Sequence, residues 1–499
     1  MKKIALFFCS FVLFQSAFSQ TVGITDFMRL NPYSNFNNPA AFVPYNWYVG
    51  VPGVSNLNFA YYNSGFSINK LSQMSNNSGN LPVDLFVKKS IKDLSKTSWL
   101  NMNVGAELLG CGFRVPKLDN YFFTFSYQIK MEQQLSYSKD LLGLLMQYSL
   151  GGNVEEFFYT RETPATLRLS QNTSIYQEFS LGMQSEVLDN LYVGARTKFL
   201  FGMLNMKTNS FSAEVFPDLN DQSIIGKFNI DLDVASVIPF YVKNNNEILL
   251  TSDGLNNFGG NFGRSYGKSF SKNAGFAIDL GAVYRINKQF RVSAAITDLG
   301  FIRWRSTPLN MTIKSVGDGI IDLKGFSKEL MADIVKNGFN LSLDSLLTLA
   351  NINFTMRERS AYTTMLTSKI MTDCYFDLNS YTRFILQFKG YIIGKTFLPQ
   401  FTIAYNGTFF DAIDVVVSYS MMKKSFANLG VGLGFRMGPA HLYLGTDNII
   451  VAAHLLNTAK VNFTAGLLVD FPFKIKHKEA ELKSMFKKDK KRTLQIDES

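Results

Sequence analysis

The side chains that most often carry out catalysis or bind metals are scarce in this chain. Its histidines and cysteines are His441, His454, His477, Cys9, Cys111 and Cys374. No histidine lies in a Ser-His or metal-ligand arrangement, and the sequence contains no G-x-S-x-G elbow or H-E-x-x-H helix. Cys111 and Cys374 lie far apart, so a disulfide between them is open but not indicated. We therefore expect that the protein is not an enzyme and that it has no cofactor and no metal site.

One segment is similar to a phosphate-binding loop. Residues 263–269 read G-R-S-Y-G-K-S and end in the Gly-Lys-Ser of such loops. They place three residues between the glycines where a phosphate loop has four, and no strand–loop–helix context surrounds them. Because Asp253 to Lys268 is rich in Gly and Asn, we interpret this stretch as a mobile loop.

Ten charged residues lie at alternate positions in segments whose other positions are mostly apolar. They are Lys130, Glu178, Glu186, Arg196, Lys198, Asp279, Arg285, Arg291, Arg436 and Asp470. Side chains that alternate along an extended chain point to opposite faces, so these charges require β-strands with one polar face. Asp298 and Asp447 stand near the ends of predicted strands, and we expect them to form turns.

The segment Val461 to Phe471, V-N-F-T-A-G-L-L-V-D-F, has one apolar and one largely polar face. The same alternation occurs at Tyr121 to Met131, with Phe122 as the exception, at Ser174 to Glu186 and at Gly275 to Arg285. Asp189-Asn190 predicts a tight turn between two such segments. Further strands are expected at about 383–394, 398–406, 415–422, 429–437 and 441–447.

The first nineteen residues have the pattern of an export signal. Lys2 and Lys3 precede an apolar stretch from Ile4 to Phe14, and Ala17-Phe18-Ser19 predicts cleavage after Ser19.

A strand of a soluble β-sandwich can show the same alternation of apolar and polar residues. Recurrence of the pattern behind an export signal, at lengths that cross a bilayer, instead favours an all-β fold, a transmembrane antiparallel β-barrel in the outer membrane.

We expect about 14 strands, with 12 to 16 as the range, because bacterial single-chain barrels use even numbers. Short loop helices are predicted at Leu85 to Leu94, Lys139 to Leu150 and Phe326 to Lys336. The predicted parts are a signal peptide at 1–19, an irregular plug or cap segment at 20–46, the barrel at 47–473 and a basic periplasmic tail at 474–499. Within the plug segment, the turn-forming residues are Asn38, Pro39 and Ala40.

Two interpretations of the ten charges remain open. They could line a lumen and select a solute by their field, or they could pair with one another and fill a narrow barrel. We prefer pairing, because a barrel of this size can be filled by its own side chains and loops. The formal charge of +11 is spread over strands, loops and tail, so nucleic acid is not an expected partner. Membrane-interface anchors are expected at Trp47, Trp99 and Trp304.

Three segments carry a family resemblance: G-A-V-Y-R-I-N-K-Q-F-R-V-S-A-A-I-T-D-L-G-F-I-R-W at 281–304, V-P-G-V-S-N-L-N-F at 51–59 and L-Y-L-G-T-D-N-I at 442–449. They resemble a family of uncharacterised Bacteroidetes outer-membrane proteins. The resemblance implies an outer-membrane barrel of unknown function and offers no catalytic residues. The N-P-A at residues 38–40 is similar to the N-terminal motif of long-chain fatty-acid transporter barrels.

Two functions fit these features. The first is a transport-type barrel, partnered by outer-membrane lipid, that admits a small or hydrophobic solute past an N-terminal plug. The alternative is a barrel without transport that acts as a scaffold or subunit of a cell-envelope secretion or gliding machine. In that case the basic tail would bind periplasmic or envelope proteins.

Overall fold

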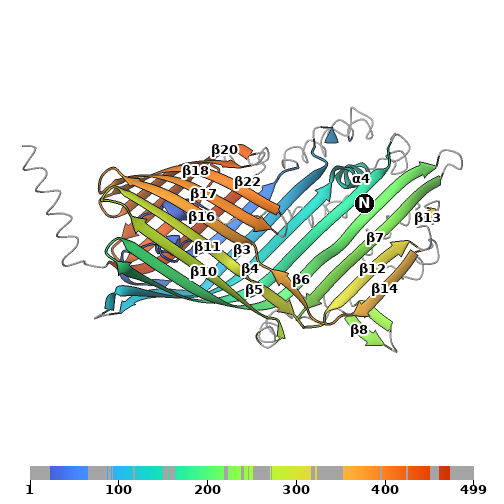
Figure 1. Ribbon diagram of the computed structural model, residues 1–499, viewed down its shortest axis with the longest axis horizontal. Helices are drawn as coiled ribbons and strands as arrows, with labels where there is room; N and C mark the ends of the chain where they lie inside the picture. The colour runs from blue at the N-terminus through green and yellow to red at the C-terminus, as the bar shows by residue number, and fades with distance from the viewer. Residues whose placement is uncertain are drawn as a thin grey trace, which may run out of the picture.

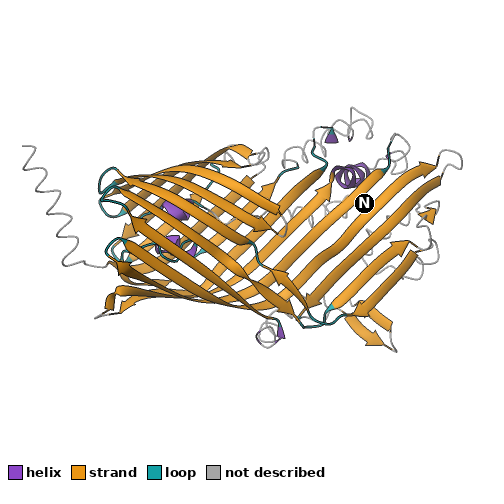
Figure 2. Ribbon diagram, viewed as in Figure 1, coloured by secondary structure: helices purple, strands orange, loops and turns teal. Residues whose placement is uncertain are grey.

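The computed structural model describes residues 23–65, 87, 91–92, 94–115, 118–149, 157, 163–218, 223–237, 241–244, 247–250, 270, 272–315, 321–322, 352–393, 396–422, 425–449 and 460–472. Most of these residues lie in strands, the orange ribbons of Figure 2. The predicted export signal, the residues 326–336, the Gly-rich stretch 253–268 and the basic tail lie outside the described residues.

The polarity of the wall is inverted relative to a soluble protein. On the last strand, β22 (Lys460–Pro472), Phe463 and Phe471 are exposed, at 46% and 39%, whereas Thr464 and Asp470 are fully buried. The two faces are those predicted from the alternation of residues 461–471. An exposed apolar face and a buried polar face require lipid outside and a polar interior, so the sheet is a transmembrane wall.

The wall closes on itself. The chain begins the sheet with β1 (Tyr45–Gly50) and β2 (Leu57–Asn63), which together form one wall strand interrupted at residues 51–56. Both segments pair with β22 on one side and with β3 (Thr97–Val115) on the other. All pairings are antiparallel, and the closed barrel has 14 wall strands, as predicted.

Three further wall strands are composites. β7 (Ser223–Ser236) and β10 (Ala274–Arg285) continue one another, because both pair with the long β6 (Leu191–Asp218). The next wall strand is formed by β11 (Phe290–Trp304), β12 (Leu309–Ser315) and β13 (Ile321–Asp322). The eighth is formed by β14 (Ile352–Glu358), β15 (Tyr362–Met365) and β16 (Ser368–Asp377).

The remaining wall strands are single. They are β4 (Leu118–Ser138), β5 (Ala165–Leu188), β17 (Thr382–Ile393), β18 (Thr396–Phe409), β19 (Ile413–Met422), β20 (Ser425–Met437) and β21 (Ala440–Thr446). A separate hairpin consists of β8 (Tyr241–Asn244) and β9 (Glu247–Leu250). The helical elements whose bounds lie within the described residues are η1 (Ile24–Phe27), η2 (Pro32–Phe36) and α4 (Lys139–Ser149), the last at a predicted helix. No helix among the described residues is long and apolar enough to cross a membrane.

The two ends of the barrel differ. Short turns join β5 to β6, β10 to β11, β16 to β17, β18 to β19 and β20 to β21, and these turns lie together at the left of Figure 1. At the other end β3 to β7, with β12 to β14 beside β7, run far beyond the remaining strands: β6 has 28 residues, whereas about 9–11 residues cross a bilayer. The long strands therefore extend the wall outside the membrane on one side of the barrel.

The helix α4 covers part of this extended wall. By alternation along β4, Tyr137 shares a face with the exposed Tyr121, so it lies on the outer surface. There it is buried in a cluster with Leu142 and Met146 of α4 and Leu167 of β5. Apolar residues that project from the wall need lipid or protein over them, and α4 supplies protein where lipid has ended.

Candidate functional site: the barrel lumen

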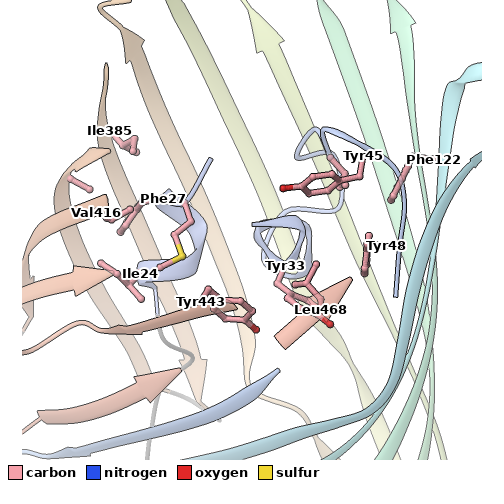
Figure 3. Close-up of a cluster of buried hydrophobic side chains, with 13 residues drawn as sticks. Ile24, Phe27, Tyr33, Tyr45, Tyr48, Phe122, Ile385, Val416, Tyr443 and Leu468 are labelled. Atoms are coloured by element: carbon pink, nitrogen blue, oxygen red, sulfur yellow. The ribbon is translucent and has the colours of Figure 1, made fainter. Parts of the chain in front are cut away.

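The lumen at the short-turn end is occupied by residues 23–44. Figure 3 shows η1 and η2 inside the wall, with Ile24 and Phe27 near Ile385 of β17 and Val416 of β19. Tyr33 lies close to Tyr443, with the ring centroids 5.8 Å apart. The buried side chains come from wall strands on several sides of the barrel, so the segment fills the cross-section at this level.

Glycines make room for this segment at two places. Gly194 of β6 and Gly281 of β10 face each other in register, and a Cβ on Gly194 would lie 2.2 Å from the carbonyl group of Pro39. A Cβ on Gly281 would lie 2.1 Å from Asn38 Oδ1. On the far wall a Cβ on Gly432 would lie 2.6 Å from Met28 Cε, and one on its pairing partner Gly445 would lie 2.5 Å from Ile24 Cγ2. The Asn-Pro-Ala residues singled out from sequence therefore lie against a pair of wall glycines.

Polar contacts hold the segment in place. Asp26 forms a buried ion pair with Lys389 of β17 at 2.8 Å. On the opposite wall Arg196 donates to the backbone oxygens of Asn35 and Phe36 at 3.1 and 3.2 Å, and its guanidinium lies 4.6 Å from the Phe36 ring centroid. Arg196 thus contacts the N-terminal segment, a role that the sequence did not predict.

A buried carboxylate joins the segment to the interruption in the first wall strand. Glu107 of β3 is buried and accepts hydrogen bonds from Tyr33 and from Ser55, which lies between β1 and β2. Ser126 donates to its other carboxylate oxygen at 2.8 Å. Six residues, 51–56, here stand opposite Gly466 and Leu467 of β22, so the interruption is a large inward bulge. Glu107 was missed because it falls in the apolar run A-E-L-L-G of β3.

Above this level paired charges line one side of the lumen. Lys198 of β6 contacts both Asp279 of β10, at 2.7 Å, and Asp298 of β11. Lys369 of β16 binds the other oxygen of Asp298, at 2.7 Å. Burying a charge is tolerated when it is paired and hydrogen-bonded, and the Asp298 amide also donates to Asp279. These residues link four successive wall strands, those that contain β6, β10, β11 and β16.

The other predicted charges lie in smaller groups. Lys130 pairs with Glu178 at 2.7 Å, and Arg436 shares Asp470, at 2.8 Å, with His441. The remaining contacts are Arg291 with Asp377 at 3.0 Å, Arg285 over the ring of Tyr192 at 5.9 Å, and Glu186, which stands opposite Tyr192 in register. The structure therefore distributes the ten residues over several groups in place of one charged row.

Two expectations need correction. Asp298 is not in a strand-end turn: it lies within β11, at a bulge with φ of +59°, and it holds two lysines. Asp447 does lie in a bend directly after β21, and its carboxylate also accepts from the Gly23 amide at 3.0 Å and from Asn462. Trp304 is fully buried and donates to Thr364 at 2.8 Å, so it is not an interface anchor. Trp47, 41% exposed and stacked on Phe471, has the exposure that such an anchor needs.

Two sequence features take no part in the described lumen contacts. Cys111 and Cys374 are both free, on β3 and β16 respectively. The Gly-Lys-Ser stretch at residues 263–269 falls outside the described residues.

The closed antiparallel sheet, its lipid-facing apolar surface and its polar, occupied interior define an outer-membrane-type β-barrel. The chain belongs to the family of unknown function DUF5723, whose model matches residues 39–447. No curated protein matches it.

Solved structures similar to this chain include a mutant of the TodX monoaromatic hydrocarbon channel, with 8% identity and a TM-score of 0.41 over 91% of this chain and 98% of that one. A FadL homologue from Pseudomonas aeruginosa has 10% identity and a TM-score of 0.41 over 91% and 100%. The toluene transporter TodX from Pseudomonas putida has 7% identity and a TM-score of 0.36 over 90% and 97%. At these values the likeness does not extend to what passes through the barrel.

Proposed function

We propose that this protein is a transport-type barrel of the outer membrane that admits a small or hydrophobic solute, with residues 23–44 as its plug. One observation carries the proposal: the segment occupies the lumen and, within the described part of the chain, joins the wall covalently where it enters β1 at Tyr45. Its other contacts are hydrogen bonds, an ion pair and apolar packing. Contacts of this kind can break and re-form, as gating requires.

The chemistry of the lumen supports the choice of solute. The mid-lumen charges are paired, so they do not present a row of one sign that would select an ion by its field. Apolar and aromatic side chains instead form two buried clusters, one around the plug and one around Trp304. Sites of this composition favour apolar ligands with a few polar groups.

A reversible covalent lock tests the proposal. A Cβ on Gly445 would lie 2.5 Å from Ile24 Cγ2, so Cβ atoms at positions 24 and 445 are at most about 4 Å apart, within the range of a disulfide. The variant is Ile24→Cys/Gly445→Cys, in a background with Cys111 and Cys374 replaced by serine. Uptake of two labelled probes, arabinose and decanoate, is measured in porin-deficient host cells whose outer leaflet is lipopolysaccharide.

We expect oxidation to lower uptake of at least one probe and reduction to restore it, while each single-cysteine variant is unaffected by oxidant. Uptake equal to that of cells without the protein, both oxidised and reduced, would overturn the transport proposal. If cross-linking through residues 474–499 of this barrel then recovered an envelope protein, that result would favour the alternative function as a scaffold.

A further inference from the structure

The eighth wall strand touches the third across the lumen. Between β15 and β16, the Thr367 hydroxyl accepts from Gln134 Nε2 of β4 at 2.6 Å and donates to Glu132 Oε2 at 3.2 Å. Gln134 and Glu132 lie on the inner face of β4, with Gln128 and Ser126, which are buried. We call Thr367, Gln134 and Glu132 the lumen clasp.

A round barrel could not make this contact. Fourteen strands spaced about 4.8 Å apart and tilted about 40° enclose a backbone circle about 28 Å across, which places strands three and eight about 25 Å apart. Two side chains of this size in hydrogen-bond contact allow a Cα separation of only about 10 Å. The wall is therefore drawn in by roughly 15 Å at the clasp.

Further contacts hold the part of the eighth wall strand that is drawn in, residues 362–369, here called the inward segment. Tyr362 Oη donates to Asn205 of β6 at 2.9 Å, although β6 is not a neighbour of β15 in the sheet. Thr364 accepts from Trp304, and Lys369 binds Asp298. None of these partners belongs to residues 23–44, so this closure stands apart from the plug.

The inward segment covers an aromatic surface. Tyr362 and Leu366 pack in a buried cluster with Trp304, Tyr176 and Leu200. Leu200 shares the inner face of β6 with Lys198, and Tyr176 donates to Glu132 of the clasp, so the cluster is luminal. Moving the segment back to the wall would open this surface to the lumen.

The closed clasp leaves a neighbouring amide unsatisfied. Asn101 stands opposite Gln134 in register and is 1% exposed, and neither end of its amide has a partner within the described part of the chain. A buried unsatisfied amide is unfavourable, and water or a solute could satisfy it once the clasp opens. The ladder between β11 and β16 is also interrupted beside the clasp, at the bulged Asp298.

We infer that the lumen clasp is a second gate, in series with the plug, and that its release exposes the aromatic surface as a binding site for an apolar solute. The inference rests on the proposed transport function and adds the site that the solute would contact. Trp304 and Tyr176 would contact the apolar body of the solute, and the Asn101 amide would form hydrogen bonds with a polar group of the solute.

The test combines the two closures. The clasp variant is Gln134→Ala/Thr367→Val, and its control is Gln133→Ala, on the opposite face of the same strand. The plug variants are a deletion of residues 23–42 and, in case the deletion does not fold, Gly194→Ala. Folding is checked by the mobility of unheated samples in denaturing gels, and decanoate uptake is measured as above.

Two gates in series predict that the clasp variant alone and the plug variant alone each raise uptake less than about threefold, while the combination raises it at least about tenfold. If a plug variant alone reaches the uptake of the combination, the second gate is refuted and the transport proposal survives. If the combination does not exceed wild type, the transport proposal fails, and the second gate fails with it as a solute gate.

A measurement that does not depend on transport distinguishes failure of the second gate from failure of the transport proposal. Leu366 is 7% exposed, so a Leu366→Cys thiol, with Cys111 and Cys374 replaced by serine, should react slowly with a membrane-impermeant maleimide. Gln134→Ala/Thr367→Val should speed this reaction at least about tenfold, and Gln133→Ala should not. Equal rates in the clasp variant and its control would overturn the inference, whatever the uptake.

Discussion

Replacing Gly194 with alanine should loosen the N-terminal segment without damaging the barrel. The new Cβ would lie 2.2 Å from the Pro39 carbonyl group and 2.5 Å from the Ala40 nitrogen. Both are backbone atoms of the segment, so no side chain can rotate away. The segment must move by about 1.2 Å to reach an ordinary contact of 3.4 Å.

A displacement of that size breaks the neighbouring hydrogen bonds. Arg196 binds the Asn35 and Phe36 oxygens at 3.1 and 3.2 Å, and Asn35 donates to Gln184 at 2.9 Å. Lengthened by about 1.2 Å, all three exceed hydrogen-bond range. Since such bonds contribute about 1 kcal/mol each, and more when one partner is charged, the seated segment should lose about 2–4 kcal/mol.

The assay measures how often the segment leaves its seat. An Ala40→Cys thiol, in a background with Cys111 and Cys374 replaced by serine, is buried when the segment is seated. A loss of 2–4 kcal/mol should raise its maleimide labelling rate about 30-fold to 900-fold. The matched control is Gly105→Ala on β3, where the added Cβ meets only Asn58 Cβ, at 3.9 Å. Labelling within twofold of this control would refute the steric reasoning.

Three further outcomes are expected. Lys198→Met should destabilise the folded barrel by about 3–5 kcal/mol in urea titrations, because it removes the nearest cation of the buried Asp279 and leaves the buried Asp298 with Lys369 alone, while Lys288→Met in an exposed turn should have no effect. Phe463→Lys places a charge on the lipid face and should cost about 2–4 kcal/mol, seen as a lower yield of folded barrel in vesicles. In single-tryptophan variants, brominated lipid should quench Trp47 and leave Trp304 bright; the reverse would contradict the lipid-facing assignment.

The strand pattern could be predicted because it is a local property. In β22 the residues expected on each face are those that the structure exposes and buries. Even the exception at Phe122 is informative. Its side chain enters the lumen and packs beside Tyr48 in the cluster that surrounds the N-terminal segment. An apolar residue on a polar face thus marked a contact with the plug segment, which the alternation alone could not identify.

The lumen residues could not be predicted in the same way. Trp304 was expected at the membrane interface because tryptophan is enriched there, yet the bulge at Asp298 switches which side chains of β11 point inward. Lys389 lies in a predicted strand and Lys369 in a strand that was not predicted, and their carboxylate partners are Asp26 in the N-terminal segment and Asp298 on β11. Such ion pairs depend on which wall strands lie next to each other, and this neighbourhood cannot be inferred from the sequence of a single strand.

The sequence by itself determined that this chain forms a lipid-facing barrel, because an extended chain alternates its side chains whatever its partners are. It also indicated the short turns and the residues of the candidate plug. Tertiary structure alone decided how the lumen is filled: the seat of Pro39 against Gly194, the carboxylate Glu107 and the clasp at Thr367. These join residues tens to hundreds of positions apart, and bulges within strands reset the alternation that sequence reasoning relies on.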